Sequence, residues 1–266
     1  MDLELTGKVA LVTGGSRGIG KAIARQLALE GADVVIAARD LAALEATATE
    51  LAAESGRQIV PLTVDTASDA SVARMVAQAV AALGQIDILV NCAARPGGQA
   101  PPPKLADITD AIFWDDVNVK VLGYLRCSRE VAPLLARQGW GRIINVSGLA
   151  ARQTGSIVGS MRNVAVAALT KNLADELGPQ GINVTVVHPG STRTEKTADL
   201  IAAQAHAHDT TPAEIERRIG TGNTLGRIIE AQEIAYVVAF LASPKSVAIN
   251  GDAISVGGGA PRAIHY

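Results

Sequence analysis

The chain is poor in aromatic residues, in cysteine and in long apolar runs, and each shortage excludes a class of protein. Aromatic residues make up 3% of the 266 positions, so the core must consist of Val, Ile, Leu and Ala, which suits a parallel sheet under close helices. The two cysteines, Cys92 and Cys127, are far apart and favour a reducing compartment over a disulfide framework. No apolar run reaches the roughly 18 residues of a membrane-spanning helix.

The chain also lacks an excess of either positive or negative charge. The net charge is −2, and no basic patch suggests a nucleic acid or an anionic membrane as a partner. The start, Met1-Asp2-Leu3-Glu4, lacks the pattern of a secretory signal. Histidines are too sparse around Gln204–His208 to form a metal site. These features predict a cytoplasmic protein with no metal and no membrane or nucleic-acid partner.

Apolar runs of strand length alternate with helical patterns, which is typical of repeated βαβ units. The predicted strands are Val9–Thr13, Asp33–Ala38, Ile59–Asp65, Ile86–Asn91, Arg142–Val146, Asn183–His188 and Ala253–Val256. The predicted helices are Ile19–Leu29, Leu41–Ser55, Ala70–Leu83, Ala111–Arg137, Ser160–Leu177 and Glu230–Leu241. No linker or composition shift divides the chain, so we predict a single domain over residues 1–266.

Two segments interrupt this alternation. Arg95–Pro103 contains four prolines and two glycines, which exclude regular structure. Residues 192–223 form a long excursion that contains a helix start of its own, Thr211-Pro212-Ala213-Glu214. Because long loops in compact domains are usually functional, we predict a substrate lid at 192–223. A solvated insertion without a role is the alternative.

A glycine-rich segment follows the first predicted strand and opens the first predicted helix. It reads Thr13-Gly14-Gly15-Ser16-Arg17-Gly18-Ile19-Gly20. Glycines permit a tight turn and let backbone N–H groups approach a pyrophosphate, whose negative charge the helix N-terminus then favours. Since strand, spacing and helix agree, the segment predicts a dinucleotide site.

Gly14–Gly20 resembles the G-x-x-x-G-x-G fingerprint of the short-chain dehydrogenase/reductase family, and further matches follow in family order. Asn91-Cys92-Ala93-Ala94 resembles the family's N-N-A-G, and Val117-Asn118-Val119-Lys120 is similar to its V-N-x-K segment. Pro189-Gly190-Ser191-Thr192-Arg193-Thr194 resembles its P-G-x-x-x-T. Gly226-Arg227 and Gly257-Gly258-Gly259 also have counterparts. The resemblance covers roughly Leu5 to Gly259 and implies an α/β fold, a Rossmann-type doubly wound parallel sheet of about seven strands with helices on both faces.

The resemblance also implies which residues bind a nicotinamide dinucleotide. The glycine loop would hold the pyrophosphate, and Ile19 would back the nicotinamide. Asp65 and Thr66 would contact adenine, although Asp65 is also explained as an acid that ends a strand. The cofactor-binding residues expected on this basis are Gly14, Ser16, Arg17, Gly18, Ile19, Gly20, Arg39, Asp65, Thr66, Asn91, Ala93, Pro189, Gly190, Thr192 and Thr194.

The charge after the second predicted strand favours NADP(H) over NAD(H). An NAD site commonly places Asp or Glu there to bind the ribose 2′-OH. Here Ala38 and then Arg39 end the strand, and Arg17 in the glycine loop adds a second guanidinium. Two such groups suit a 2′-phosphate. Asp40 leaves an alternative open, in which Arg39 pairs with that carboxylate at the surface.

No tyrosine and no lysine occurs between Leu125 and Thr170, where the resemblance places the proton chemistry. The family uses a serine and then Tyr-x-x-x-Lys, supported by an asparagine on the preceding helix. In register with the family, Gly148 stands at the serine position, Gly159 at the tyrosine position and Asn163 at the lysine position.

Asn118 and Ser147 are the catalytic candidates that remain in this register. Asn118 matches the family's supporting asparagine, although helix geometry alone explains it equally well. Ser147 is one position early, and neighbouring strand residues point to opposite faces. A positioned acid contributes roughly 10²–10⁴-fold to a rate, so losing it without replacement would leave a very poor carbonyl reductase.

Three functions are compatible with an intact dinucleotide-binding segment and a degenerate active site. The first is an atypical NADP(H)-dependent oxidoreductase acting on a small carbonyl, alcohol or enone. The second is a catalytically inactive cofactor sensor or scaffold, and the third is a lyase or isomerase that reuses the fold. Fold alone does not choose among them.

The helix after the missing motif is apolar nearly all round at Val164–Leu169. Such a helix must be buried on several sides. The family typically pairs this helix across a dimer interface and usually forms tetramers. We therefore predict a homo-oligomer, either a dimer or a homotetramer.

Overall fold

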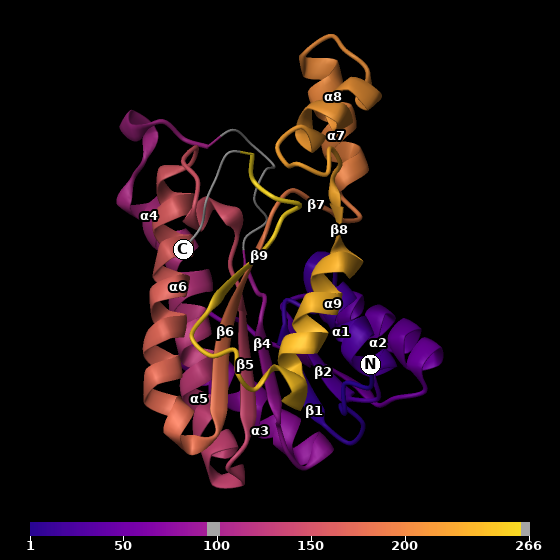
Figure 1. Ribbon diagram of the computed structural model, residues 1–266, viewed down its shortest axis with the longest axis vertical. Helices are drawn as coiled ribbons and strands as arrows, with labels where there is room; N and C mark the ends of the chain where they lie inside the picture. The colour runs from indigo at the N-terminus through magenta and orange to yellow at the C-terminus, as the bar shows by residue number, and fades with distance from the viewer. Residues whose placement is uncertain (95–101, 262–266) are drawn as a thin grey trace.

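A seven-stranded sheet forms the centre of the computed structural model, which describes residues 1–94 and 102–261 (Figure 1). The strands are β1 (Val9–Thr13), β2 (Asp33–Ala38), β3 (Ile59–Thr63), β4 (Ile88–Asn91), β5 (Gly141–Val146), β6 (Ile182–Pro189) and β9 (Ala253–Val256). Their order is β3-β2-β1-β4-β5-β6-β9, and every neighbouring pair is parallel. The predicted doubly wound parallel sheet is confirmed.

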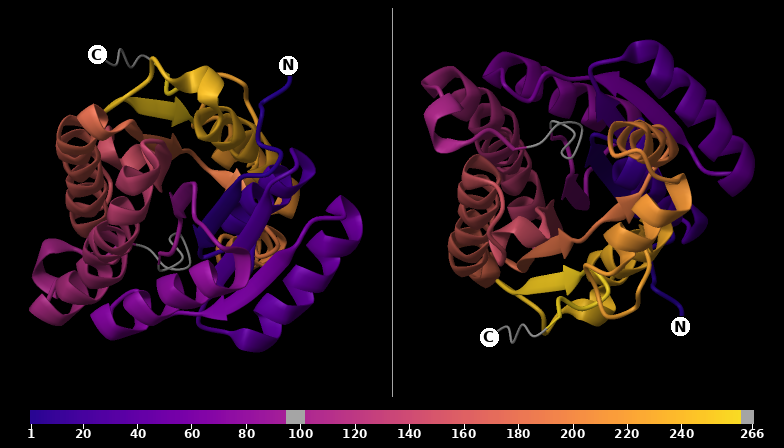
Figure 2. Two further views of the ribbon diagram at one scale, coloured as in Figure 1. Left: turned by 90° about the horizontal axis from the view of Figure 1, so that it is seen from below. Right: turned by 90° about the horizontal axis from the view of Figure 1, so that it is seen from above.

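Helices cover both faces of this sheet (Figure 2). They are α1 (Gly18–Leu29), α2 (Leu41–Ser55), α3 (Asp69–Leu83), α4 (Asp110–Val117), α5 (Gly123–Gln138), α6 (Ile157–Leu177), α7 (Thr197–Ala207), α8 (Pro212–Gly220) and α9 (Ala231–Ala242). Short 3-10 turns connect some of them: η1 (Leu105–Asp107), η3 (Leu149–Ala151), η4 (Gly178–Gln180) and η5 (Pro244–Ser246).

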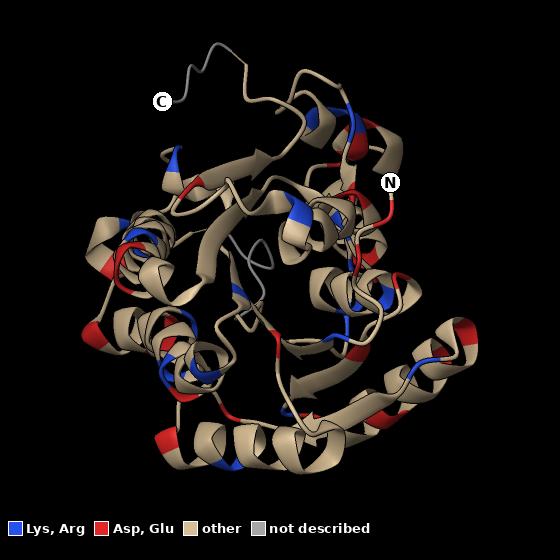
Figure 3. Ribbon diagram, turned by 60° about the horizontal axis from the view of Figure 1, so that its bottom comes forward, with Lys and Arg blue, Asp and Glu red and all other residues tan. Residues whose placement is uncertain are grey.

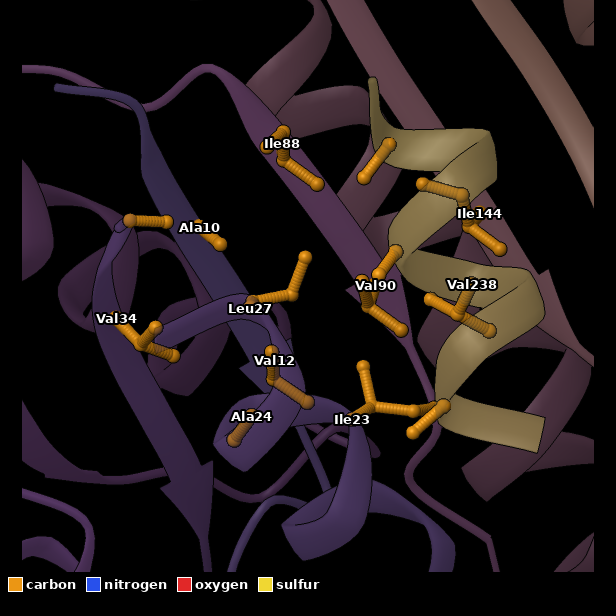
Figure 4. Close-up of a cluster of buried hydrophobic side chains, with 14 of the residues drawn as sticks. Ala10, Val12, Ile23, Ala24, Leu27, Val34, Ile88, Val90, Ile144 and Val238 are labelled. Carbon is orange, nitrogen blue, oxygen red and sulfur yellow. The ribbon is translucent and has the colours of Figure 1, made fainter. Parts of the chain in front are cut away.

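Two separate hydrophobic cores lie on the two faces, because successive strand residues point in opposite directions. Ala10 and Val12 of β1 pack against α1, α2 and α9, and Figure 4 shows this cluster in close-up. Leu11, between them in the sequence, packs with residues of α3, α5 and α6 on the other face. Burial on both faces explains why the strands are continuous apolar runs rather than alternating ones.

The helix predicted over Ala111–Arg137 is not continuous. Its N-terminal part is α4 and its C-terminal part is α5, and one turn of π-helix, η2 (Asn118–Leu122), joins them. A π turn holds more residues than an α turn, so it changes which side chains face the sheet, and such turns are frequent at functional sites. The sequence pattern shows only a long helix, because the periodicity on either side of the turn is helical.

The predicted lid segment contains α7 and α8, which stand beyond the ends of the sheet strands in Figure 1. The segment begins at β7 (Thr192–Arg193), which pairs in parallel with β8 (Ile229–Glu230), a short strand that follows the segment. Ile201 and Ala205 pack with Ile215 and Ile228 in a small core of their own. The segment is therefore an ordered helical unit with its own small hydrophobic core, next to a two-stranded parallel sheet.

Several expectations concern features outside the sheet. Most of the proline-rich loop Arg95–Pro103 lies outside the described residues. Within residues 1–94 and 102–261, no helix combines the length and apolar character needed to cross a bilayer. In those same ranges, no group of three or more His, Cys, Asp or Glu side chains is placed to hold a metal ion. Lys, Arg, Asp and Glu are interspersed on the face drawn in Figure 3, with neither sign dominating.

Candidate active site

A cavity of about 1280 Å³ opens at the carboxyl ends of the strands, where the strand order reverses between β1 and β4. Ligands of doubly wound sheets bind at such a switch point. The glycine loop, the ends of β2, β4, β5 and β6, and the lid all contribute to its walls. Of the expected cofactor-binding residues, the cavity is lined by Gly14, Ser16, Arg17, Gly18, Ile19, Gly20, Arg39, Asp65, Thr66, Ala93, Pro189, Gly190, Thr192 and Thr194.

The glycine loop has a shape that side chains would fill. Gly14 has φ +72°, and a Cβ there would lie 2.9 Å from the backbone nitrogen of Ala93. Gly18, at φ +57°, begins α1, so its N–H belongs to the helix N-terminus. These constraints keep the backbone at the start of a helix clear of side chains, which is the arrangement that binds a pyrophosphate. The residues present therefore fit a dinucleotide.

One carboxylate already occupies a phosphate-like position on this loop. Glu195, from the lid, accepts hydrogen bonds from the Gly18 N–H at 3.0 Å and 3.2 Å through its two oxygens. Its negative charge meets the positive end of the α1 dipole, as a phosphate would. The loop therefore accepts an anion, and the anion it holds in this structure is part of the chain.

Two guanidinium groups border the cavity where a 2′-phosphate would lie. Arg39 follows β2 and Arg17 precedes α1, and both are exposed and line the cavity. Asp40 caps α2 by accepting from the Ala43 N–H at 3.1 Å. Among the described residues, no ion pair joins Arg39 to Asp40. The surface pairing that was the alternative to phosphate binding is therefore not formed.

Asn91 differs from the other expected cofactor residues because it does not line the cavity. Its side chain is fully buried, and its Nδ2 donates to Asn145 Oδ1 at 2.9 Å. Asn145 in turn donates to Thr170 Oγ1 at 2.9 Å. Asn91 thus connects β4 to β5, and its neighbours Cys92 and Ala93 form the wall of the cavity instead.

The positions expected for serine, tyrosine and lysine lie close together. Ser147 Oγ donates to the Asn163 carbonyl oxygen at 3.1 Å, and a Cβ on Gly148 would lie 3.2 Å from Asn163 Nδ2. Gly159 is buried in the first turn of α6, next to the Ser156 side chain that caps that helix. Ser147, Gly148 and Asn163 line the cavity, whereas Gly159, the position expected for tyrosine, is not among the described residues that line it.

The tyrosines and the strand histidine of the described residues lie outside the cavity. Tyr124 is fully buried and donates its hydroxyl to the Val146 carbonyl oxygen at 2.8 Å, and burial raises its pKa well above 10. Tyr236 is exposed on α9. His188 is buried in β6 and does not line the cavity.

The structure does not bring Asn118 to the cavity. Its Oδ1 accepts from Arg126 Nη1 at 2.9 Å, and its side chain is not among those that line the cavity. Lys120, two residues on, takes the inward place. Its side chain is 4% exposed, lines the cavity and donates to the Ser147 carbonyl oxygen at 2.8 Å. The π turn and the packing of η2 decide this outcome, which the sequence pattern did not reveal.

Burial makes Lys120 an unusual lysine. Desolvation, helped by the nearby positive charge of Arg162, lowers its pKa from 10.5 to about 7, against the opposing influence of Cys92 and Asp116. Arg162 itself is paired with Asp116, with Nη1 to Oδ2 at 2.6 Å. Cys92 has its pKa raised to about 11 by burial. The amine therefore exchanges protons near neutral pH in a wall of the cavity.

Comparisons with known proteins agree with this architecture. A family model described as enoyl-(acyl carrier protein) reductase matches residues 14–261. Short-chain reductase protein NovJ of Streptomyces niveus is 37% identical over 255 residues, covering 95% of this chain and 94% of the relative. The 3-oxoacyl-acyl-carrier-protein reductase FabG of Pseudomonas aeruginosa is 36% identical over 267 residues, covering 97% and 98%.

A solved structure extends the similarity to the whole fold. The crystal structure of L-sorbose reductase from Gluconobacter frateurii, complexed with NADPH and L-sorbose, matches with a TM-score of 0.93 at 26% identity. The match covers 99% of this chain and 100% of that chain. The fold and site define a dinucleotide-binding α/β protein, and the chain belongs to the short-chain dehydrogenase/reductase family.

Proposed function

We propose that the chain is an NADP(H)-dependent oxidoreductase that reduces the carbonyl group of a small ketone. The observation that carries this proposal is one continuous cavity, which runs from two arginines and a phosphate-binding loop to a buried amine. Relatives named as reductases, and a structural neighbour that holds NADPH, support the same assignment. When bound, the reduced nicotinamide supplies a hydride to the carbonyl carbon.

In this proposal the cofactor lies across the switch point of the sheet. Gly14–Gly20 holds the pyrophosphate, and Arg17 and Arg39 hold the 2′-phosphate. The end of β6 and the segment after it bind the nicotinamide end. Ser147 and Asn163 border the substrate chamber, while Asn118 and Asn91 act only through structure. The site is atypical because Gly148, Gly159 and Asn163 stand where the family resemblance expects serine, tyrosine and lysine.

Cofactor preference tests the first half of the proposal. In Arg39→Ala, NADPH affinity should fall about tenfold or more, because each charge-assisted hydrogen bond contributes about 1.5–3 kcal/mol. NADH affinity should change little, since NADH lacks the 2′-phosphate. Fluorescence titration with both cofactors measures this. Arg74→Ala is the matched control, an exposed arginine on α3 that does not line the cavity.

Turnover tests the second half. NADPH oxidation is followed against a panel of 3-oxoacyl thioesters, ketoses, simple ketones and enones. Saturable turnover with at least one carbonyl class supports the reductase. Tight NADPH binding without turnover across the panel would replace this proposal with a cofactor sensor or scaffold. A product formed with no net change in NADPH would point to an isomerase or lyase.

A further inference from the structure

A carbonyl reduction in this cavity needs a proton donor, and the described cavity walls offer few. Arginines do not give up a proton near neutral pH, and Asp65 and Glu195 are acceptors once ionised. Cys92 holds its proton up to a pKa of about 11. Lys196 is exposed on the lid, whereas Lys120 is buried in the chamber wall. Among the described lining residues, Lys120 is the one whose amine is buried in the cavity wall and has a pKa of about 7.

The position of the Lys120 amine leaves it free to reach a ligand. An ammonium has three N–H donors, and one of them is held by the Ser147 carbonyl oxygen at 2.8 Å. No second partner for Nζ is found among the described residues. This single hydrogen bond holds the amine beside Ser147 and Asn163. The other two N–H groups of the ammonium are available to a ligand in the cavity.

The surroundings of Lys120 come from four elements. Arg162 on α6 disfavours the charged amine, and Asp116 on α4 and Cys92 after β4 favour it. The Ser147 carbonyl at the end of β5 accepts from it. Desolvation outweighs the attraction of Asp116, whose carboxylate is already engaged by Arg162. An acid whose pKa lies near the working pH is the most effective proton donor.

We propose that the Lys120 ammonium is the acid that protonates the substrate oxygen. The inference rests on the proposed reductase function. A bound reduced nicotinamide would supply the hydride, so its own C–H bond would break as the new C–H bond forms at the carbonyl carbon. The π bond of the C=O group would break at the same time, placing its electron pair on oxygen. That oxygen takes a proton from Lys120 Nζ, so an O–H bond forms as an N–H bond breaks. The neutral amine keeps the electron pair and regains a proton from water in the cavity.

Competitive labelling of the protein without cofactor tests the amine itself. Acetic anhydride is applied at a series of pH values, and mass spectrometry follows each lysine. Lys120 should titrate with a midpoint near pH 7 and should be protected by NADPH. Lys171 is the internal control, an exposed lysine whose pKa is raised above 10.5 by Asp175. A Lys120 midpoint near 10 would overturn the proposal, and so would failure to label at any pH.

Kinetics of three variants test the role. Lys120→Met should lose roughly 10²–10⁴-fold in kcat, with NADPH affinity within threefold of the wild type. Lys120→Arg keeps the charge but not the exchangeable proton, so it should be about as slow as Lys120→Met. Activity retained in Lys120→Arg would overturn proton donation in favour of a fixed positive charge. Lys171→Met should behave as wild type.

The pH profile gives an independent readout. In the direction of carbonyl reduction, kcat/KM of the wild type should fall as pH rises through about 7, because the acid loses its proton. In Lys120→Met this step should disappear. A profile that is flat between pH 6 and pH 9 would contradict the proposal. If the wild type binds NADPH without turnover, the reductase function fails, while the labelling result still measures the amine.

Discussion

At the scale of single residues, the proposed chemistry of the site depends on the contrast between Asn118 and Lys120. Asn118 and Lys120 are two residues apart in the π turn η2, so their side chains point to roughly opposite sides and only one of the two faces the cavity. Lys120 is the inward residue and Asn118 contacts Arg126. Resemblance to a motif pointed to Asn118, whereas burial and packing select Lys120.

Lys120 also makes the stability of the fold depend on pH. Its pKa falls from 10.5 in the exposed state to about 7 in the folded chain. Between these values the unfolded chain binds more protons, so the free energy of unfolding rises with pH by up to roughly 1.4 kcal/mol per unit. Lys120→Met removes this effect. Its melting temperature should exceed that of the wild type at pH 6, and the difference should shrink as pH rises to 9.

Calorimetry of both proteins at matched pH measures that difference. Lys171→Met serves as the control. Since Asp175 raises the pKa of Lys171 above 10.5 in the folded chain, the folded and unfolded chains both keep the proton at Lys171 across this range. Its melting temperature should therefore keep a constant offset from the wild type. A constant offset for Lys120→Met as well would show that the folded amine titrates near its usual value.

At the scale of elements, the lid and the N-terminus of α1 are joined through Glu195. The carboxylate occupies the anion position on the glycine loop, so a bound pyrophosphate and Glu195 compete for the Gly18 N–H. A negative side chain at a helix N-terminus contributes about 0.3–1 kcal/mol, and up to about 2 in partly buried sites. We therefore expect cofactor binding to displace Glu195 and move the segment that leads to α7.

Neutralising this carboxylate should strengthen cofactor binding. Glu195→Gln should bind NADPH about two- to tenfold more tightly, and the gain should shrink at high salt because charge repulsion is screened. Titration calorimetry at two salt concentrations measures both effects. Asp199→Asn, a change at an exposed acid in the first turn of α7, is the control. Weaker binding by Glu195→Gln would mean that the carboxylate supports the cofactor site.

At the scale of the whole molecule, α6 presents an apolar stripe that the single chain leaves uncovered. Ile157, Met161 and Val164 are 46%, 53% and 51% exposed, and Leu125 on the neighbouring helix α5 is 38% exposed. The sequence predicted that this helix is buried on several sides, whereas the single chain leaves the side that carries these residues exposed. Contiguous exposed apolar surface of this kind marks protein–protein contacts, which supports the proposed homo-oligomer.

A charge in this stripe should break the assembly. The wild type should sediment as a dimer or tetramer at micromolar concentration, and Met161→Glu should shift it to a smaller species, because burying an unpaired carboxylate is costly. Leu29→Glu is the control, since Leu29 is an exposed apolar residue of α1, which does not pack beside α6. A monomeric wild type in analytical ultracentrifugation would refute the oligomer.

Many of the helices and strands can be predicted from the sequence because short stretches of residues determine them. Three strands, β1, β2 and β9, have the predicted bounds, and so does α2. Apolar runs and helix-capping residues act over a few positions, so they indicate a strand or a helix even when the element that packs against it is unknown. The continuous helix Ala111–Arg137 is wrong, because a π turn keeps the helical spacing of apolar residues on either side. The sequence pattern also did not indicate α7 or the two-residue strands β7 and β8.

The sequence alone determined the seven strands of the main sheet and their alternation with helices, the glycine loop at Gly14–Gly20 and the two arginines beside it, since backbone freedom and charge belong to each residue type. It also determined that tyrosine and lysine are missing from the stretch Leu125–Thr170. Tertiary structure decided that Lys120 faces the cavity, that Asn91 and Asn118 turn away, and that Glu195 lies on the loop. Each of these depends on which distant elements pack together, and burial, not residue type, sets the pKa of the amine.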